Sequence, residues 1–256
     1  MSNFLIIIIL IILYYYNKKK IRRLFKKKIK SVEIENVHEI FKPNKITDNL
    51  LGPSDDLIIK SFSIPQSYKI VGMTTDYESW ILSCLSKISK NIFEFGTCSG
   101  KNTYLMALNS SQDTKIISLT LSQEQSKNLN LSKKDNNISI KNILKESNYE
   151  KFLFSGKKVQ SKIDIIFIDS REFKTVNFLK KFDLIFIDGG HTYSVVKNDS
   201  EKAFEMLSYG GIIIWHDYVV GKESSKDVCK YIHELEKEKK IYHIKNTSMC
   251  YYKNNL

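Results

Sequence analysis

Two apolar runs, each ending in acidic or imidazole side chains, constrain the fold of this chain more than any other feature. The first, FDLIFID, covers residues 182–188 and ends at Asp188. The second, IIIW, covers residues 212–215 and leads directly into His216 and Asp217. Short continuous apolar runs of this kind are typical of buried strands in a parallel sheet. If the two strands are parallel neighbours, their polar ends meet at one sheet edge, where open α/β folds bind ligands.

The residues between these runs predict the connection that parallel strands require. Gly189 and Gly190 follow the first run and lead to His191. A helical segment is expected to about Leu207, and the pair Gly210-Gly211 is expected to turn the chain into the second run. A strand, a helix and a second strand in this order predict a βαβ unit and hence an α/β fold.

A glycine-rich loop stands in a second strand–turn–helix pattern, NIFEFGTCSGKNTYLMALNS, with the helix expected from Thr103 onward. This geometry lets a backbone approach a ligand while a helix N-terminus faces it. Gly96 and Gly100 enclose only three residues, whereas a P-loop needs four. A dinucleotide-binding loop needs a glycine at position 98, which is cysteine here. Both nucleotide-binding patterns therefore fit poorly.

The same loop fits the acid-x-Gly-x-x-x-Gly pattern of class I S-adenosylmethionine (SAM) methyltransferases. From about residue 72 to residue 253 the chain resembles this family, in the branch with DGxH and HDY motifs that includes catechol and macrolide-sugar O-methyltransferases. The motifs GMTTDYE, EFGTCSGKNT, DGGHTY and GGIIIWHDY occur in the family's order. The resemblance implies a Rossmann-like fold with a mostly parallel seven-stranded sheet, an antiparallel final strand and helices on both faces.

The resemblance also implies which residues bind SAM. These are Glu94, Gly96, Thr97, Gly100, Thr103, Thr120, Gln125, Asp169, Ser170 and Asp188. Asp169 and Ser170 would contact the adenine, with a plain strand-end turn as the alternative. Thr120 departs from the acid that commonly binds the ribose. Thr120 and Gln125 resemble the TLSxEQ turn of cyclopropane-fatty-acid-synthase-like members, and an equal alternative is that they cap a helix.

Methyl transfer from SAM to a hydroxyl oxygen needs a base, a divalent metal ion that lowers the acceptor pKa, or both. The candidate catalytic residues are Asp188, His191 and His216. Acids at the positions of Asp188 and Asp217 hold Mg²⁺ in catechol-type enzymes, although Tyr218 stands where those enzymes have asparagine. Each histidine has a structural donor role as its alternative.

The first 30 residues predict a membrane anchor with a basic flank. Residues 4–16 are apolar without a break, and residues 18–30 carry nine Lys/Arg and no acid. A spanning helix usually needs about 20 apolar residues, so the run is short, and a signal peptide or a buried helix are the alternatives. The positive-inside rule would make this a single-pass anchor with the catalytic domain in the cytosol. The basic flank would contact anionic lipids.

The remaining organisation is a lead-in over residues 31–72, which contains all three prolines, and a methyltransferase domain over residues 73–256. Thr75 or Asp76 is expected to cap the first helix of that domain. The net charge of +12 belongs mostly to residues 18–30, since the rest of the chain has 31 basic and 28 acidic residues. Nucleic-acid methylation is therefore disfavoured. The four cysteines show no metal or disulfide spacing, which favours free thiols in a reducing compartment.

The predicted function is O-methylation of a small-molecule, sugar or lipid-linked acceptor. A membrane-tethered binding module with the methyltransferase fold but no activity is the alternative from another class. A nucleotide-dependent dehydrogenase is disfavoured by the loop.

Overall fold

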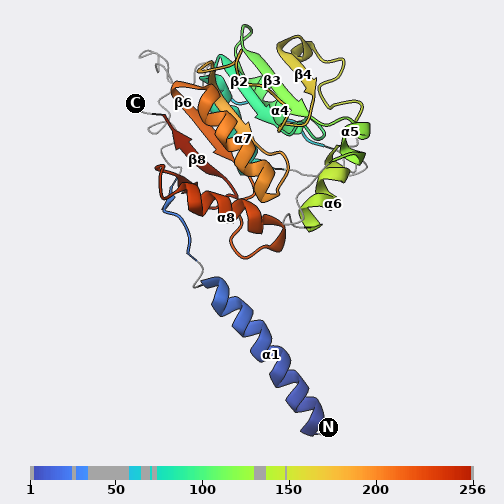
Figure 1. Ribbon diagram of the computed structural model, residues 1–256, viewed down its shortest axis with the longest axis vertical. Helices are drawn as coiled ribbons and strands as arrows, with labels where there is room; N and C mark the ends of the chain where they lie inside the picture. Colours follow the sequence, from blue (N-terminus) through green and yellow to red (C-terminus); the bar gives the residue numbers. More distant parts are fainter. Residues whose placement is uncertain are drawn as a thin grey trace.

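An eight-stranded sheet with the order β1-β7-β8-β6-β5-β2-β3-β4 forms the centre of the protein (Figure 1). The computed structural model describes residues 3–24, 27–33, 58–64, 70, 74–129, 137–147 and 149–254. The strands are β1 (Ser31–Val32), β2 (Asn91–Phe95), β3 (Lys115–Thr120), β4 (Ile163–Phe167), β5 (Phe182–Ile187), β6 (Leu207–Trp215), β7 (Tyr242–Ile244) and β8 (Cys250–Lys253). Only β8 is antiparallel to its neighbours, β6 and β7. The expected parallel sheet with an antiparallel final strand is confirmed.

The eighth strand comes from the segment that the sequence predicts to be a lead-in. β1 pairs with β7, with Ser31 opposite His243 and Val32 opposite Ile244. Two residues are too short to show a strand pattern, so periodicity could not reveal this strand. Most of the lead-in (34–57, 65–69, 71–72) and residue 73, where the domain was expected to begin, lie outside the described residues.

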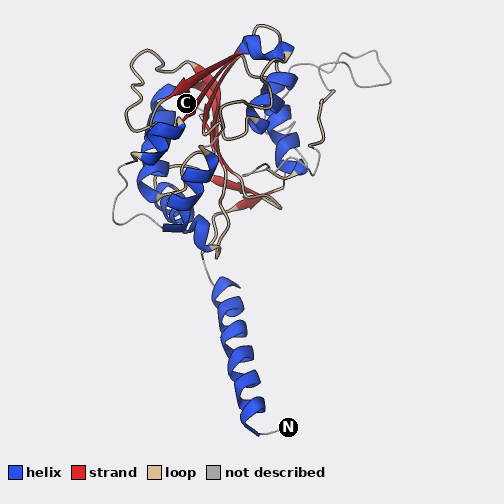
Figure 2. Ribbon diagram, turned by 90° about the vertical axis from the view of Figure 1, so that its right-hand side faces the viewer, coloured by secondary structure: helices blue, strands red, loops and turns tan. Residues whose placement is uncertain are grey.

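Helices cover both faces of the sheet (Figure 2). They are α3 (Asp76–Lys87), α4 (Lys101–Asn109), α5 (Gln123–Lys127), α6 (Asn137–Glu146), α7 (Tyr193–Met206) and α8 (Lys226–Leu235), with 3₁₀ turns η2 (Lys158–Lys162) and η3 (Glu223–Ser225). Side chains of α3 and α4 share one buried cluster with Ile92 and Leu184. Side chains of α7 and α8 share the other with Phe93 and Ile185. Alternate residues of each buried strand thus serve opposite faces.

The expected turn at Gly210-Gly211 is wrong, because both glycines lie inside β6. The strand begins at Leu207, immediately after α7 ends at Met206. The pairing of β5 with β6 shifts register between Phe182 and Leu184. An irregularity of this kind absorbs extra residues in one strand, which is a common use of glycine within strands.

The apolar N-terminal stretch forms helix α1 (Asn3–Leu24), which extends away from the sheet in Figure 1. Its large side chains from Ile6 to Tyr16 are exposed. Among the described residues, however, no helix combines the length and the apolar character that crossing a membrane requires. The apolar run is shorter than a bilayer core requires, and lysines follow it within the same helix. A spanning anchor is therefore not supported, and the cytosolic placement stays a prediction.

Residues 27–33, called the docked arm below, are anchored on the edge of the sheet through Ile29. The Ile29 side chain is 2% exposed. Its backbone N–H donates to the Tyr218 hydroxyl at 3.1 Å. The same hydroxyl lies 2.8 Å from Nε2 of His233. Tyr218 directly follows Asp217, so the arm is tied to the end of β6.

A Tyr218→Phe variant is expected to lose about 1–2 kcal/mol of unfolding free energy, because the buried Ile29 N–H would lose its acceptor. Urea denaturation would measure the loss. Tyr252→Phe is the matched control, since no hydrogen bond of the Tyr252 hydroxyl occurs among the described residues and the ring contact with Phe204 remains. Equal stability of the two variants would contradict the role of the Tyr218 hydroxyl.

Candidate active site

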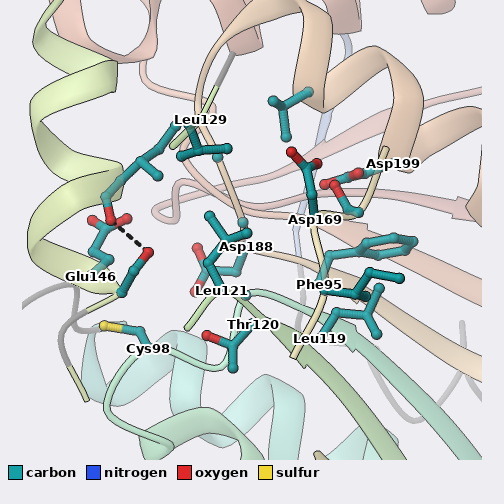
Figure 3. A pocket seen from close by; sticks show the side chains of 18 residues that line it. Phe95, Cys98, Leu119, Thr120, Leu121, Leu129, Glu146, Asp169, Asp188 and Asp199 are labelled. Carbon is teal, nitrogen blue, oxygen red and sulfur yellow. Dashed lines mark hydrogen bonds between the residues drawn. The ribbon is translucent and has the colours of Figure 1, made fainter. Parts of the chain in front are cut away.

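A cavity lies at the carboxyl ends of β2, β3, β4 and β5, with about 630 Å³ of empty space including its open mouth (Figure 3). Five residues predicted to bind a cofactor border it: Gly96, Thr120, Asp169, Ser170 and Asp188. Side chains that sequence reasoning missed border it too, among them Cys98, Leu121, Ile143, Glu146, Val195 and Asp199. The cavity is thus at the sheet edge that the sequence indicated.

Gly96 allows the loop after β2 to touch the end of β5. Its φ of +96° is in the range that favours glycine, and a Cβ here would lie 2.3 Å from the backbone oxygen of Asp188. Its N–H donates to the Leu119 carbonyl at the end of β3. Gly96 therefore joins three strand ends around the cavity.

Five of the predicted cofactor residues do not border the cavity and contact protein groups instead. These are Glu94, Thr97, Gly100, Thr103 and Gln125. The Thr97 hydroxyl lies 2.6 Å from that of Ser118. Gly100 faces the Phe154 ring, which a Cβ would approach to 2.7 Å.

Gln125 forms a capping box at the start of α5, the alternative role considered from sequence. Its backbone N–H donates to the Ser122 side chain, while its Oε1 accepts from the Ser122 N–H. Its Nε2 donates to the Phe167 carbonyl at 3.2 Å. The Gln125 amide is therefore committed to local structure.

Glu94 is a fully buried acid between β2, β3 and α4. Its Oε2 accepts from the hydroxyls of Thr103 and Ser118, each at 2.5 Å. Its Oε1 has no hydrogen-bond partner. Burial raises the pKa of Glu94 to about 7, although both hydroxyls act in the opposite direction.

Glu94 is expected to make stability fall as pH rises. Because its folded-state pKa exceeds the unfolded value, the folded state binds more protons between about pH 4.5 and 7. The wild type should therefore lose up to about 3 kcal/mol more than a Glu94→Gln variant between pH 4.5 and 8. Denaturation over this range measures the difference. The exposed Glu124→Gln should keep the wild-type slope, and an unchanged slope in Glu94→Gln would contradict the assignment.

Two acids and two histidines gather at the ends of β5 and β6, and one of them, Asp188, borders the cavity. Nδ1 of His216 lies 2.9 Å from Oδ1 of Asp188 and 3.1 Å from Oδ2 of Asp217. Nε2 of His191 lies 2.5 Å from Oδ2 of Asp217. Asp217 itself has a left-handed φ of 63°. The apolar runs over residues 182–188 and 212–215 thus bring their polar ends together.

The carboxylates determine the charge state of both histidines. Burial lowers the pKa of His216, but the charge and hydrogen bond of Asp188 outweigh it and raise that pKa well above 6.5. Burial also opposes the charge of Asp217 at His191, whose pKa is raised to about 9. Burial raises and the charge of His191 lowers the pKa of Asp217, which falls well below its usual range. Both shifts favour the protonated imidazole, in which neither ring nitrogen can accept a proton as a base.

Glu78 and Asn102 extend this cluster, and sequence reasoning did not place either in the site. Oε2 of Glu78 lies 3.4 Å from Nε2 of His216. Its Oε1 accepts from the Ser248 N–H and hydroxyl at 2.6 and 2.7 Å. Asn102 donates to Oδ2 of Asp188 at 3.2 Å. Glu78 is the last residue of the motif GMTTDYE, and Asn102 follows Lys101 in the motif EFGTCSGKNT. Neither position shows from sequence alone that the side chain reaches the ends of β5 and β6.

The geometry also brings metal-ligating atoms together. One ligand atom from each of Asp188, His191 and Asp217 lies within 4.8 Å of the others. Both ring nitrogens of His191 are buried without a hydrogen bond, despite the short distance to Asp217. Two carboxylates and an imidazole are a donor set that suits a divalent cation, which would bind the neutral form of the imidazole.

Comparisons with known proteins agree with the fold. Residues 93–218 match the model of a methyltransferase domain family. No curated protein sequence matches the chain. A protein assigned as an O-methyltransferase from Klebsiella pneumoniae is 15% identical, with 71% of this chain and 82% of that chain covered and a TM-score of 0.50.

Two further solved structures are similar. Cofactor-bound Rv0187 from MTB is 10% identical over 72% of this chain and 82% of that chain, with a TM-score of 0.50. An O-methyltransferase from Bacillus cereus in complex with S-adenosylhomocysteine (SAH) is 15% identical over 71% and 83%, with a TM-score of 0.49. At such identities the two structures with a TM-score of 0.50 show a shared fold. The match over residues 93–218 is thus to a methyltransferase domain, and the structures with a TM-score of 0.50 share its fold.

Proposed function

We propose that this protein transfers a methyl group from SAM to a hydroxyl oxygen of a small-molecule, sugar or lipid-linked acceptor. The proposal rests on the chemistry of the cavity, on the family match over residues 93–218, and on the solved O-methyltransferases described above. One of those relatives holds SAH, which is the product that SAM leaves after methyl transfer.

The observation that carries the proposal is the charge of the cavity lining. Its described ionisable side chains are carboxyls, from Glu146, Asp169, Asp188 and Asp199, together with the Cys98 thiol, and no lysine, arginine or histidine is among them. A dinucleotide would bring a pyrophosphate, which needs donors or positive charge. SAM has a nucleoside, a sulfonium and an ammonium group, and no phosphate. A cavity with acids and a close-approach glycine suits SAM better.

Different residues of the cavity would contact different parts of SAM. Gly96 lets the backbone approach closely, and Thr120 with Asp169 and Ser170 offers polar groups at the ends of β3 and β4. Arg171 holds Asp169 through Nε at 3.0 and 3.1 Å. Burial raises and these bonds lower the pKa of Asp169, with a net lowering, so the acid is an ionised acceptor for hydroxyl or amino groups.

A divalent cation such as Mg²⁺ would be held by Asp188, His191 and Asp217. When bound, it would lower the pKa of the acceptor hydroxyl and so assist its deprotonation. The residues of the chain itself orient this site: Asn102 and His216 fix Asp188, and Glu78 fixes His216 from the other side.

Calorimetry with SAH, followed by transfer of labelled methyl groups from SAM, tests the proposal. We expect one SAH site per chain and transfer to a lipid or small-molecule extract, reduced by EDTA and restored by Mg²⁺. Absence of SAH binding would contradict the methyltransferase function. Binding without transfer to any fraction would favour the non-catalytic module, and transfer that EDTA leaves unchanged would exclude the cation.

A further inference from the structure

Four carboxyl groups border the cavity, and three of them are held by protein partners. They are Asp169 (held by Arg171), Asp188 (held by His216 and Asn102) and Asp199 (held by Asn198). The fourth is Glu146. Throughout the described ranges, no hydrogen-bond donor or cation pairs with the Glu146 carboxylate. An acid that faces a cavity without a protein partner has its acceptor capacity available for a ligand.

Glu146 enters the cavity from a different direction than the strand-end acids. It is the last residue of α6, a helix in the segment between β3 and β4. Figure 3 shows its side chain on the opposite side of the cavity from Asp169 and Asp199, with Asp188 between them. The lining also includes the apolar Leu121, Leu129 and Ile143. Glu146 thus brings a carboxyl group to a part of the lining that also includes Cys98 and Ser147.

Glu146 and Asp188 line the same cavity, and the charges of the candidate reaction centre act on the Glu146 carboxyl. Burial raises the pKa of Glu146 to about 7, with the charges of His191, Asp188 and Asp217 as the next largest influences. A carboxyl with a pKa near neutrality can take up and release a proton at working pH. The position of the Glu146 carboxyl on the cavity lining is known independently of this pKa.

The other candidate bases are less well placed. Neither His191 nor His216 borders the cavity. His216 is enclosed by the carboxylates of Asp188, Asp217 and Glu78. Asp188 borders the cavity, but its two oxygens already accept from His216 and Asn102. Among the described groups, Glu146 is the one that combines access to the cavity with an uncommitted carboxylate.

We propose that Glu146 binds the acceptor hydroxyl and receives its proton during methyl transfer, an inference that rests on the proposed function. The acceptor oxygen forms a bond to the methyl carbon. The bond between that carbon and the sulfonium sulfur breaks, and its electron pair stays on sulfur. The O–H bond breaks, its electrons stay on the acceptor oxygen, and the proton passes to the Glu146 carboxylate and then to water. The acceptor is accordingly a neutral hydroxyl compound without a phosphate or carboxylate near the reacting oxygen.

Glu146→Gln in the full chain separates this role from cofactor binding. General-base catalysis contributes about 10²–10⁴-fold, so methyl transfer from labelled SAM to a cell extract should fall at least 100-fold. SAH affinity by calorimetry should change less than threefold, because the carboxylate faces the acceptor. Glu150→Gln is the matched control: it makes the same change at an exposed residue four positions further on and should leave both measurements unchanged.

Each other outcome has a distinct meaning. Normal transfer by Glu146→Gln would overturn the role of Glu146 alone. A tenfold or greater loss of SAH affinity, in a variant whose thermal unfolding is unchanged, would assign Glu146 to the cofactor instead. If the wild type binds SAH but transfers no methyl group, the role fails together with the proposed function. A lower melting temperature than that of Glu150→Gln would show a structural role.

Discussion

A Gly96→Ala variant is expected to lose about 3 kcal/mol or more of folding stability and at least 30-fold in SAH affinity. The added Cβ would lie 2.3 Å from the Asp188 oxygen and 2.6 Å from the Gly189 Cα, and both are backbone atoms that cannot rotate away. The positive φ adds a penalty of about 1–2 kcal/mol, and forcing atoms into a packed site adds about 1–3 kcal/mol. The end of β5 must therefore move away from the end of β2.

The effect on binding follows from the position of the clash. Gly96 and Asp188 both border the cavity, so separating them changes its shape. Gly156→Ala is the matched control, because Gly156 has a similar φ of +72° with nothing within 4 Å of its virtual Cβ. It should cost about 1–2 kcal/mol and leave SAH binding intact. Chemical denaturation measures the folding stability, and calorimetry measures the SAH affinity. If both variants lost the same amounts, the positive φ alone would account for the effect, and the close contact between Gly96 and the Asp188 backbone would not.

The sheet could be predicted because its signals are local. Each buried strand is an apolar run whose period and length are visible in sequence, and the acids that end β5 and β6 follow from the strand ends themselves. Their meeting at one edge follows from parallel pairing, which the structure confirms with Ile187 opposite Trp215. The two-residue β1 and the glycines inside β6 were missed because a short strand and a register shift leave no periodic pattern.

The directions of individual side chains could not be predicted from the sequence. Glu94 matches the acid of a cofactor-binding motif, yet in the structure it is enclosed with Thr103 and Ser118. Glu146 belongs to no motif, because its place in the cavity depends on how α6 packs and not on neighbouring letters. The histidines were read as possible bases from their residue type. The three carboxylates around His216, from Asp188, Asp217 and Glu78, could be known only once these residues were placed in space. The same holds for the Asp217 carboxylate beside His191.

Asp188→Asn is expected to reduce methyl transfer at least 1000-fold, the largest effect among the variants considered. The Asp188 carboxylate balances the charge of His216 at 2.9 Å and accepts a hydrogen bond from Asn102 at 3.2 Å. An amide at position 188 would remove the negative charge, and its NH₂ group would face either the His216 ring N–H or the Asn102 NH₂, which are both donors. If Asp188 also helps hold a divalent cation, the variant loses that ligand as well. Two such losses at one centre justify the magnitude.

Comparison with Asp217→Asn and with the double variant shows whether the two acids act as one unit. Groups that hold one cation are strongly non-additive, because removing either one already abolishes the shared function. The double variant should then be no slower than the worse single variant, and Mn²⁺ used as a paramagnetic probe should bind the wild type but none of the three variants. Multiplied losses with Mn²⁺ binding retained would show that Asp188 and Asp217 act separately through His216 and His191. That outcome would leave Asp188 as the partner of His216 and would exclude a cation from the reaction centre.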